Sequence, residues 1–386
     1  MTIKLTPELE EARAAIRKFV DNELEPWAKV IDDTGEIPAE VTTLLAKNGY
    51  LGLRLDETYG GAGVGLAYYC LVLEEMGRSH RGFSTIVGAT SGNTPLAIMR
   101  FGTDEQRKKY LPGLAGGTLR TAFALTEPGA GSDSAAMQTK ATRSEKGWVI
   151  DGRKHFISGA QAADFVMVMV VTDPAKRARG GITAFLVERG TPGFSVTRVD
   201  TTIGSPSIKL AELSFDHCVV DDSAVLGEVG QGFKIAMESL TEGRLNVACS
   251  CIGSADRLLE MSSTYALQRS TFGKPLAERQ AIQWMLADSA VELTAARAMT
   301  YATIVDVEAG ADVGSRPSMC KLYCSEMVGR VADRAVQVHG GMGVIRGFPV
   351  ERFYRDVRHY RVGEGTSEVQ RMLIARQLLK EAGQRS

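Results

Sequence analysis

Glu364 is the carboxylate whose surroundings most clearly suit chemistry, because it stands between Gly363 and Gly365. Glycine on both sides lets the backbone approach a ligand closely and leaves the carboxylate unobstructed. Thr366 and Ser367 follow and can cap a helix. A carboxylate at such a loop-to-helix junction can act as a general base. The same residues are also typical of an acid that only stabilises the start of a helix, so the pattern alone leaves both interpretations open.

A polar, glycine-rich stretch with the sequence TEPGAGSD runs from Thr126 to Asp133 and is stiffened by Pro128. Unhindered backbone N–H groups and hydroxyls in such a loop can hold anionic oxygens, either those of a phosphate or a flavin carbonyl. An ordinary surface loop with a capping serine and aspartate would have the same composition. The stretch is therefore a candidate ligand site without a settled ligand.

The cysteines and histidines do not indicate a metal centre. Cys320 and Cys324, one helical turn apart, could form a ligand pair, but no second pair or nearby histidine completes it. The five histidines contain no HExxH spacing. We therefore expect no protein-bound metal, and we expect the cysteines to be buried structural thiols: Cys70, Cys218, Cys249, Cys251, Cys320 and Cys324.

The charge balance excludes two classes of protein. Lys and Arg number 45 and Asp and Glu 46, which gives a net charge of −1, so a nucleic-acid-coating or polybasic membrane protein has no electrostatic driving force here. The longest apolar run, 165–171, is far shorter than the roughly 20 residues that span a bilayer. Glu8, Glu10 and Glu11 stand where a secretory signal needs basic and apolar residues. We expect a cytoplasmic protein with no targeting signal, no nucleic-acid partner and no membrane insertion.

Three zones of hydrophobic period must position the candidate residues. The first, up to residue 119, is helical: Thr6 and Pro7 mark a helix start, and further helices are predicted at 66–77 and 103–111. From 120 to 226, short apolar runs alternate with turns, which is typical of a small antiparallel barrel or sandwich. Beyond 227, long helical patterns indicate a helix bundle, with helices predicted at 233–267, 276–307, 318–337 and 367–379.

This order of helices, strands and helices differs from the alternation of a doubly wound dinucleotide fold. The run from Gly340 to Gly343 lacks the third glycine of the G-x-G-x-x-G fingerprint, and no P-loop pattern occurs. An NAD-type Rossmann enzyme is therefore disfavoured.

The chain resembles the acyl-CoA dehydrogenase flavoprotein family from end to end, through TEPGAGSD, RSTFGK at 269–274 and EGTSE at 364–368 in the expected order. The resemblance implies a mainly α protein with a central all-β domain: an N-terminal helical domain at 1–119, a β-barrel at 120–226 and a C-terminal four-helix bundle at 227–386. It also implies FAD, an acyl-CoA substrate, a homotetramer built as a dimer of dimers, and an electron-transfer flavoprotein as electron acceptor.

Position by position, the resemblance implies that Glu364 is the catalytic base. It implies a wall along the flavin ring formed by Phe123, Leu125, Thr126, Gly131, Ser132, Phe156, Ile157 and Ser158. The FAD pyrophosphate and adenosine would contact residues that come partly from a neighbouring subunit: Arg269, Ser270, Thr271, Phe272, Gln280, Gln337, Val338, Gly340 and Gly341. Thr366 and Glu368 would add FAD contacts. On the substrate side, the resemblance implies Ser132, Thr241, Arg244, Gly363, Gly365 and Arg376.

Some residues keep a second interpretation or depart from the family pattern. Arg244 could instead form a salt bridge near Glu242, and Glu242 is a second carboxylate in a region where some relatives place an alternative base. The residue before the base is often aromatic in the family, whereas this chain has Gly363. Loss of a large ring there should widen the acyl pocket, so the sequence does not identify the acyl chain of the substrate.

The expected reaction is FAD-dependent α,β-dehydrogenation of an acyl-CoA thioester to the trans-2-enoyl-CoA. Glu364 would remove the α-proton while the β-hydrogen leaves as hydride to flavin N5. An acyl-CoA oxidase, an enoyl-CoA reductase or a desulfinase on the same fold is the alternative. A catalytically silent relative that binds acyl-CoA or a partner is a third, from a different functional class.

Overall fold

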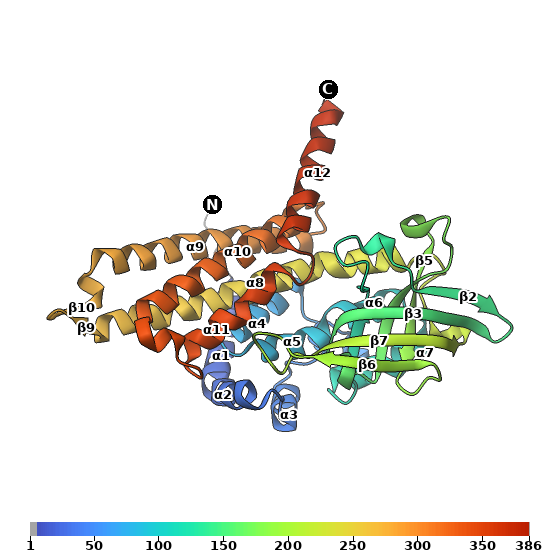
Figure 1. Ribbon diagram of the computed structural model, residues 1–386, viewed down its shortest axis with the longest axis horizontal. Coiled ribbons are helices and arrows are strands. Elements are labelled where there is room, and N and C mark those ends of the chain that lie inside the picture. Colours follow the sequence, from blue (N-terminus) through green and yellow to red (C-terminus); the bar gives the residue numbers. More distant parts are fainter. Residues whose placement is uncertain (1–5, 386) are drawn as a thin grey trace.

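The computed structural model describes residues 6–385 and places one sheet domain beside a large body of helices (Figure 1). Thr6 caps the first helix through its side chain, which accepts a hydrogen bond from the Leu9 N–H, and proline occupies the first helical turn. The N-terminal helices are α1 (Pro7–Phe19), α2 (Glu25–Thr34), α3 (Ala39–Lys47), α4 (Leu66–Met76), α5 (Arg81–Ser91), α6 (Asn93–Phe101) and α7 (Asp104–Ala115).

Eight strands follow and form one mixed sheet in the order β6-β7-β3-β2-β4-β5-β8, with β1 paired to β4. The strands are β1 (Thr121–Ala124), β2 (Lys140–Ser144), β3 (Gly147–Ser158), β4 (Phe165–Val171), β5 (Ile182–Glu188), β6 (Phe194–Asp200), β7 (Leu210–Val220) and β8 (Val225–Leu226). The predicted central β domain is confirmed. Its strands are not all antiparallel as expected, because β1 and β2 pair with β4 in parallel. The sheet path runs from β6 at one edge to β8 at the other.

Long helices make up the C-terminal region: α8 (Gly232–Gln268), α9 (Gln280–Glu308), α10 (Arg316–His339), α11 (Pro349–Val357) and α12 (Ser367–Arg385). A two-stranded hairpin, β9 (Ser270–Thr271) with β10 (Lys274–Pro275), joins α8 to α9. The predicted helices correspond to α8, α9, α10 and α12, with ends displaced by a few residues, as expected for termini that fray. The domain boundaries at 119/120 and 226/227 stay a proposal.

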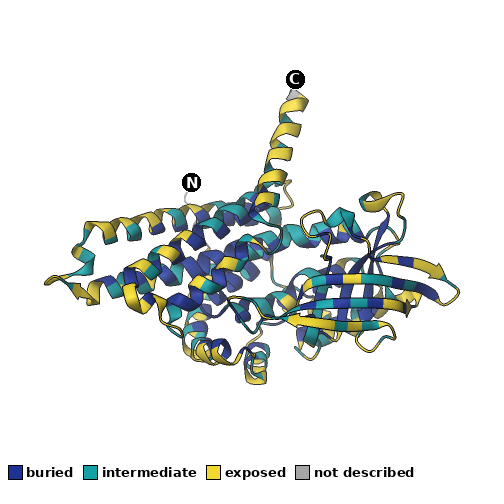
Figure 2. Cartoon of the chain, in the orientation of Figure 1, coloured by how far each residue is buried: buried dark blue, intermediate teal, exposed yellow. Residues whose placement is uncertain are grey.

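Three apolar cores occur in the described chain, and two of them join these parts, while the third lies within the sheet domain (Figure 2). One core joins the N-terminal helices α1 and α4 to the C-terminal helices α8 to α11. The other joins α6, α7 and the first turn of α8 to one face of the sheet. All seven residues of β4 are buried because both faces of this strand are covered. Helix α8 therefore crosses from the sheet domain into the bundle and fixes their relative position.

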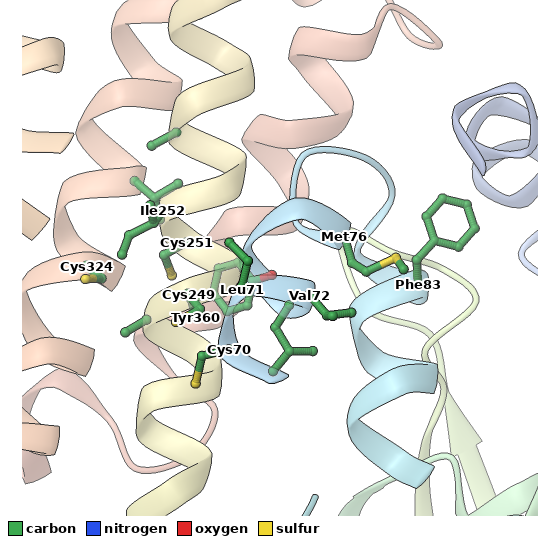
Figure 3. Close-up of a cluster of buried hydrophobic side chains, with 14 of the residues drawn as sticks. Cys70, Leu71, Val72, Met76, Phe83, Cys249, Cys251, Ile252, Cys324 and Tyr360 are labelled. Carbon is green, nitrogen blue, oxygen red and sulfur yellow. The ribbon is translucent and has the colours of Figure 1, made fainter. Parts of the chain in front are cut away.

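The six cysteines are free thiols and all are buried, as predicted. Figure 3 shows Cys70 of α4 opposite Cys249 and Cys251 of α8, among aliphatic side chains. Burial raises the pKa of Cys251 and of Cys324, so both thiols stay protonated at neutral pH. Within residues 6–385, no helix is both long and apolar enough to cross a membrane.

Candidate functional site

Glu364 lies in the short loop between a 3-10 turn (Arg358–Arg361) and α12, in a backbone conformation that is unusual for its residue type. Its φ angle is +58°, and that of Gly365 is +83°. A non-glycine residue with positive φ stores strain of about 1–3 kcal/mol, and such strain concentrates at functional sites. Surrounding hydrogen bonds hold this loop: Gln370 Nε2 donates to the carbonyls of Glu364 and Gly365 at 3.1 Å each.

The Glu364 carboxylate is only partly satisfied. Oε1 accepts a long hydrogen bond of 3.5 Å from Asn93 Nδ2. Oε2 is inaccessible to solvent and has no hydrogen-bond partner among residues 6–385. A Cβ at Gly243 would stand 3.0 Å from Oε2, so glycine there leaves room for the carboxylate. Burial raises the pKa of Glu364, and Asn93, Arg244 and Lys321 oppose that rise. A carboxylate of raised pKa with one enclosed, unpartnered oxygen is well suited to removing a proton.

Arg244 faces the base rather than Glu242. Glu242 is bound instead by Arg54 through one carboxylate oxygen and by Arg100 through the other. The alternative interpretation of Arg244, a salt bridge near Glu242, finds no such contact with Glu242 itself. Cations hold both Glu242 oxygens, which makes Glu242 a poor base. Arg244 Nε is buried without a partner within the described part of the chain, which leaves it available to a ligand. Thr241 lies one turn earlier on α8, with its hydroxyl bonded to Met237 O at 2.8 Å.

The TEPGAGSD loop is fixed from below by a buried ion pair. Lys154 Nζ donates to Glu127 Oε1 at 2.8 Å and to Leu125 O at 3.0 Å. Glu127 also accepts hydrogen bonds from the N–H groups of Gln138 and Thr139. The His155 N–H donates to Thr126 O at 2.8 Å. These contacts bring the loop and the end of β3 together, which the sequence predicted only through the family resemblance.

An exposed aromatic ring stands at the end of β3. Phe156 has a φ of +57° and is 56% exposed, and its ring stacks on His155 with centroids 3.9 Å apart. Ile157 is buried in the sheet core, so only its backbone is available to a ligand, whereas the Ser158 side chain is exposed. An accessible ring beside exposed hydroxyls and glycine N–H groups, including Ser132 and Gly131, fits a planar and polar group such as a flavin ring. The partly exposed Phe123 lies on β1 of the same sheet.

The predicted pyrophosphate and adenosine residues lie at the opposite end of the molecule (Figure 1). Helix α8 has 37 residues, which at 1.5 Å each gives about 55 Å, and Arg269 follows its C-terminal end. Phe272 in the hairpin is 98% exposed. Gly340 and Gly341 have nothing within 4 Å of an added Cβ, so they leave an open cradle. Within one chain, the described residues of this group do not meet those of the flavin wall. The other members of this distant group are Ser270, Thr271, Gln280, Gln337 and Val338.

The residues assigned to α12 are also spread out. Thr366 starts the helix, with its hydroxyl accepting a hydrogen bond from the Val369 N–H at 3.3 Å. Glu368 is exposed on the first turn. Arg376 lies more than two turns farther along a helix that projects from the body (Figure 1), and it is exposed. The structure therefore does not bring Arg376 next to Glu364 within one chain.

The space beside Gly363 differs from the sequence expectation. An added Cβ would stand 2.5 Å from Nε2 of His359, which is closer than real Cβ atoms come to other atoms. Its φ is not in the positive range that favours glycine. Burial, with Arg81 and Lys321, lowers the pKa of His359 to about 3, so this imidazole is neutral at physiological pH. The sequence predicted open volume beside Gly363 in place of an aromatic ring. That prediction is wrong on the side to which a Cβ would point, because His359 fills the space there.

Sequence reasoning missed three residues that shape this site: Asn93, Lys321 and Gln370. Lys321 donates to Gly365 O at 2.7 Å and is fully buried. It stands on the apolar face of α10 with Cys320, Cys324 and Val328. A lysine inside an apolar helical stripe is rare without a function, and that signal could have identified it. Asn93 and Gln370 carry no comparable signal.

Comparisons with known proteins agree with this geometry. The chain matches the acyl-CoA dehydrogenase N-terminal, middle and C-terminal domain families over residues 6–118, 122–218 and 230–379. It is 38% identical over 382 residues to an acryloyl-CoA reductase (NADH) of Anaerotignum propionicum, covering 98% of this chain and 96% of that protein. The structure of butyryl-CoA dehydrogenase from Megasphaera elsdenii superposes with a TM-score of 0.92 at 35% identity, covering 98% and 100% of the two chains.

A structure described as an FAD complex of PigA superposes with a TM-score of 0.93 at 28% identity, covering 98% of this chain and 99% of that one. The exposed ring, hydroxyls and glycine cradles described above fit such a cofactor. The chain therefore belongs to the acyl-CoA dehydrogenase family of FAD-dependent oxidoreductases.

Proposed function

We propose that the protein catalyses α,β-dehydrogenation of an acyl-CoA thioester to the trans-2-enoyl-CoA, with Glu364 as the base. The observation that carries this proposal is the state of the Glu364 carboxylate. The side chain is partly buried, its Oε2 is inaccessible to solvent and has no partner in the described chain, and desolvation raises its pKa. A base of raised pKa, held in one place, can accept a proton from a weakly acidic carbon more readily than an ordinary carboxylate can.

The reaction breaks two C–H bonds and forms one C=C bond. Glu364 takes the α-hydrogen as a proton, and the electron pair of that bond becomes the new double bond. The β-hydrogen leaves with its electron pair, and FAD when bound supplies the acceptor for it at N5. The protein's own part is to place the base and to exclude water.

The thioester carbonyl must be polarised for the α-proton to become acidic, and the Glu364 backbone N–H can contribute to this. Among the turn and loop hydrogen bonds of residues 6–385, none is donated by the Glu364 N–H to a backbone carbonyl. The left-handed φ of Glu364 sets the direction of this N–H. A preorganised N–H aimed at a developing oxyanion typically contributes about 2.7–4 kcal/mol of transition-state stabilisation.

We assign the FAD contacts and substrate contacts to the residues that the family resemblance indicated. The support for the flavin wall is the exposed position of Phe156, Gly131 and Ser132 beside the fixed loop. For Arg244, the support is its unpartnered buried Nε next to the base. For the far-end group, it is the exposure of Arg269, Gln280 and Gln337 and the open space at Gly340 and Gly341. Val338 is buried, so only its backbone could contribute.

A homotetramer built as a dimer of dimers belongs to this proposal. Large apolar side chains are exposed on α9 and α12, and a monomer rarely exposes such extended apolar surface. Trp284 is 60% exposed, Val291 69% and Leu379 73%. A second copy that covers the far end of one chain would also complete the divided FAD site.

An enoyl-CoA reductase is the second candidate, because the acryloyl-CoA reductase relative is 38% identical to this chain over nearly its whole length. An oxidase and a desulfinase remain further alternatives on the same fold. We propose electron-transfer flavoprotein as the electron acceptor. Reoxidation of the reduced flavin by dioxygen would indicate an oxidase, reoxidation by electron-transfer flavoprotein a dehydrogenase, and preferred turnover of enoyl-CoA with a reductant a reductase.

The variant Glu364→Gln tests the proposed base. It keeps the size of the side chain and removes its basicity, so FAD content should stay unchanged while anaerobic bleaching of the flavin by acyl-CoA slows. General base groups typically contribute about 10²–10⁴-fold. The measurement is stopped-flow absorbance over a panel from butyryl-CoA to branched and cyclic acyl-CoAs. Wild-type bleaching rates in Glu364→Gln on every substrate would disprove the assignment.

A further inference from the structure

Lys321 stands out among the buried charges next to the site. Its side chain is fully buried, and its ammonium group donates to Gly365 O at 2.7 Å. Within residues 6–385, it forms no salt bridge within 4.0 Å. Glu326, one turn farther along α10, is instead occupied by Ser367 at 2.6 Å and lies within 4.0 Å of Arg361 and Arg371.

A buried ammonium without a carboxylate is costly, since desolvation of an ion costs several kcal/mol even after relaxation. Burial accordingly lowers the pKa of Lys321, while Cys251 and Glu364 act in the opposite direction. A cost of this kind is typical of a functional position rather than of a stabilising one.

We propose that Lys321 is a positioning residue for the reaction, which holds the Glu364–Gly365 backbone in its left-handed form and supplies a fixed positive charge beside the base. This inference rests on the proposed function. The hydrogen bond from Lys321 fixes the peptide between Gly365 and Thr366, and Gln370 donates to that carbonyl and also to Glu364 O in the peptide that follows the base. The two donors together keep the Glu364 N–H and its carboxylate aimed at the same place.

Three groups from three helices face the base. Asn93 of α6 donates to it, Arg244 of α8 and Lys321 of α10 act on it through their charges, and all three favour its ionised form. Arg244 is also a candidate substrate contact, and Asn93 makes only a long bond. Lys321 is thus the cation whose place is fixed by the protein alone, before any ligand binds.

Two substitutions separate the charge of Lys321 from its hydrogen bond. Lys321→Gln keeps an N–H donor without the charge, whereas Lys321→Met removes both. Loss of the charge should raise the pH at which the rate of flavin bleaching reaches half its plateau, because an adjacent opposite charge shifts the pKa of a carboxylate by roughly 1–3 units. We expect a rise of about one unit for both variants, and a plateau about tenfold lower for Lys321→Met only, since a misaligned base loses rate.

The measurement is the rate of anaerobic flavin bleaching by butyryl-CoA, or by the fastest acyl-CoA of the panel, between pH 5 and 10. α-Deuterated substrate shows whether α-proton removal limits the rate. The matched control is the other fully buried lysine, in the double variant Glu127→Gln with Lys154→Met. It removes a buried cation and its partner beneath the TEPGAGSD loop, so its rate and FAD content are not compared with those of the wild type. Only its pH midpoint is compared, and that midpoint should not move.

The outcomes distinguish this inference from the function on which it rests. Unchanged bleaching in Glu364→Gln overturns the proposed function itself. A strongly impaired Glu364→Gln together with wild-type midpoints in both Lys321 variants overturns only the role of Lys321. An equal shift in the control variant would also overturn it, because any buried lysine would then have the same effect. If Lys321→Met does not fold, the midpoint of Lys321→Gln alone decides.

Discussion

Two glutamates of this chain, the buried Glu127 and the partly buried Glu364, each have a fully buried lysine nearby and show opposite arrangements. At Glu127, the lysine meets the carboxylate directly, with Lys154 Nζ 2.8 Å from Oε1. At Glu364, Lys321 is turned to a backbone carbonyl, and the carboxylate keeps one oxygen without a partner. Burial alone would raise the pKa of each acid. At Glu127, Lys154 and the N–H donors outweigh burial and lower the pKa, whereas at Glu364 burial prevails.

The difference separates a carboxylate that builds the site from one that can react. Both oxygens of Glu127 accept hydrogen bonds, so the carboxylate stays ionised, and its charge-assisted hydrogen bonds stabilise the TEPGAGSD loop. Glu364 is under-coordinated, so it can change protonation state without breaking an ion pair. The protein places a cation near both acids, and the atom to which the cation donates decides which role each acid has.

The largest expected effect comes from breaking the ion pair between Lys154 and Glu127. Lys154→Met leaves Glu127 buried and unpaired, so the free energy of unfolding should fall by about 3–5 kcal/mol. Urea denaturation measures this loss. The double variant Glu127→Gln with Lys154→Met should recover much of it, because no uncompensated charge remains. A stability of Lys154→Met equal to that of the wild type would show that the pair does not carry the loop.

At Glu364, replacing the charged group should raise the free energy of unfolding rather than lower it. The pKa of Glu364 is raised above its ordinary 4.5, so the folded state binds this proton more tightly than the unfolded state. Stability is therefore lost as pH rises from about 4.5 through the raised value. Glu364→Gln lacks this titration and should be more stable than the wild type at pH 8, by about 1.4 kcal/mol per unit of raised pKa.

Thermal unfolding of both proteins between pH 4 and 9 checks this sign. The difference in Tm should vanish at the acidic end and favour Glu364→Gln at the alkaline end. A wild type that is the more stable protein at pH 8 would show that Glu364 is satisfied in solution, as Glu127 is.

The smallest effect is expected at Asn93, whose bond to Glu364 is 3.5 Å long. Asn93→Ala should raise the pH midpoint of flavin bleaching by a few tenths of a unit, less than a hydrogen bond of about 1 kcal/mol would give at ideal length. The comparison with Lys321→Gln is informative, because it sets the effect of a charge against that of a neutral donor on the same carboxylate. A larger shift for Asn93→Ala than for Lys321→Gln would mean that the neutral donor dominates.

The sequence predicted the order of the helical and β regions because these depend on local patterns. The glycines marked Glu364 only as a candidate, and its role as the base came from the family resemblance and stays a prediction. Helical period marked α8, α9 and α10, short apolar runs marked the strands, and glycines marked Glu364. The parallel pairing of β1 and β2 with β4 could not be predicted, because short runs specify strands but not their partners. The hydrogen bond from Lys321 to Gly365 O joins residues 44 positions apart, and no local sequence pattern predicts such a contact.

The space beside Gly363 shows the same limit. A glycine in place of a ring indicates missing volume, but the neighbour that fills it is set by the preceding turn, where His359 stands. Pocket size therefore depends on both positions, and neither alone predicts the acyl chain.

The length of α8 has a consequence for the behaviour of the protein at low concentration. It separates the flavin wall from the far-end cradles by about the span of 37 residues at 1.5 Å each. With the proposed divided site, holding the cofactor and associating into oligomers become one linked equilibrium, so dilution releases FAD and added FAD drives assembly by mass action. Apparent cofactor affinity would then be a function of protein concentration, and a dilute assay would report a colourless, inactive protein without any residue having changed.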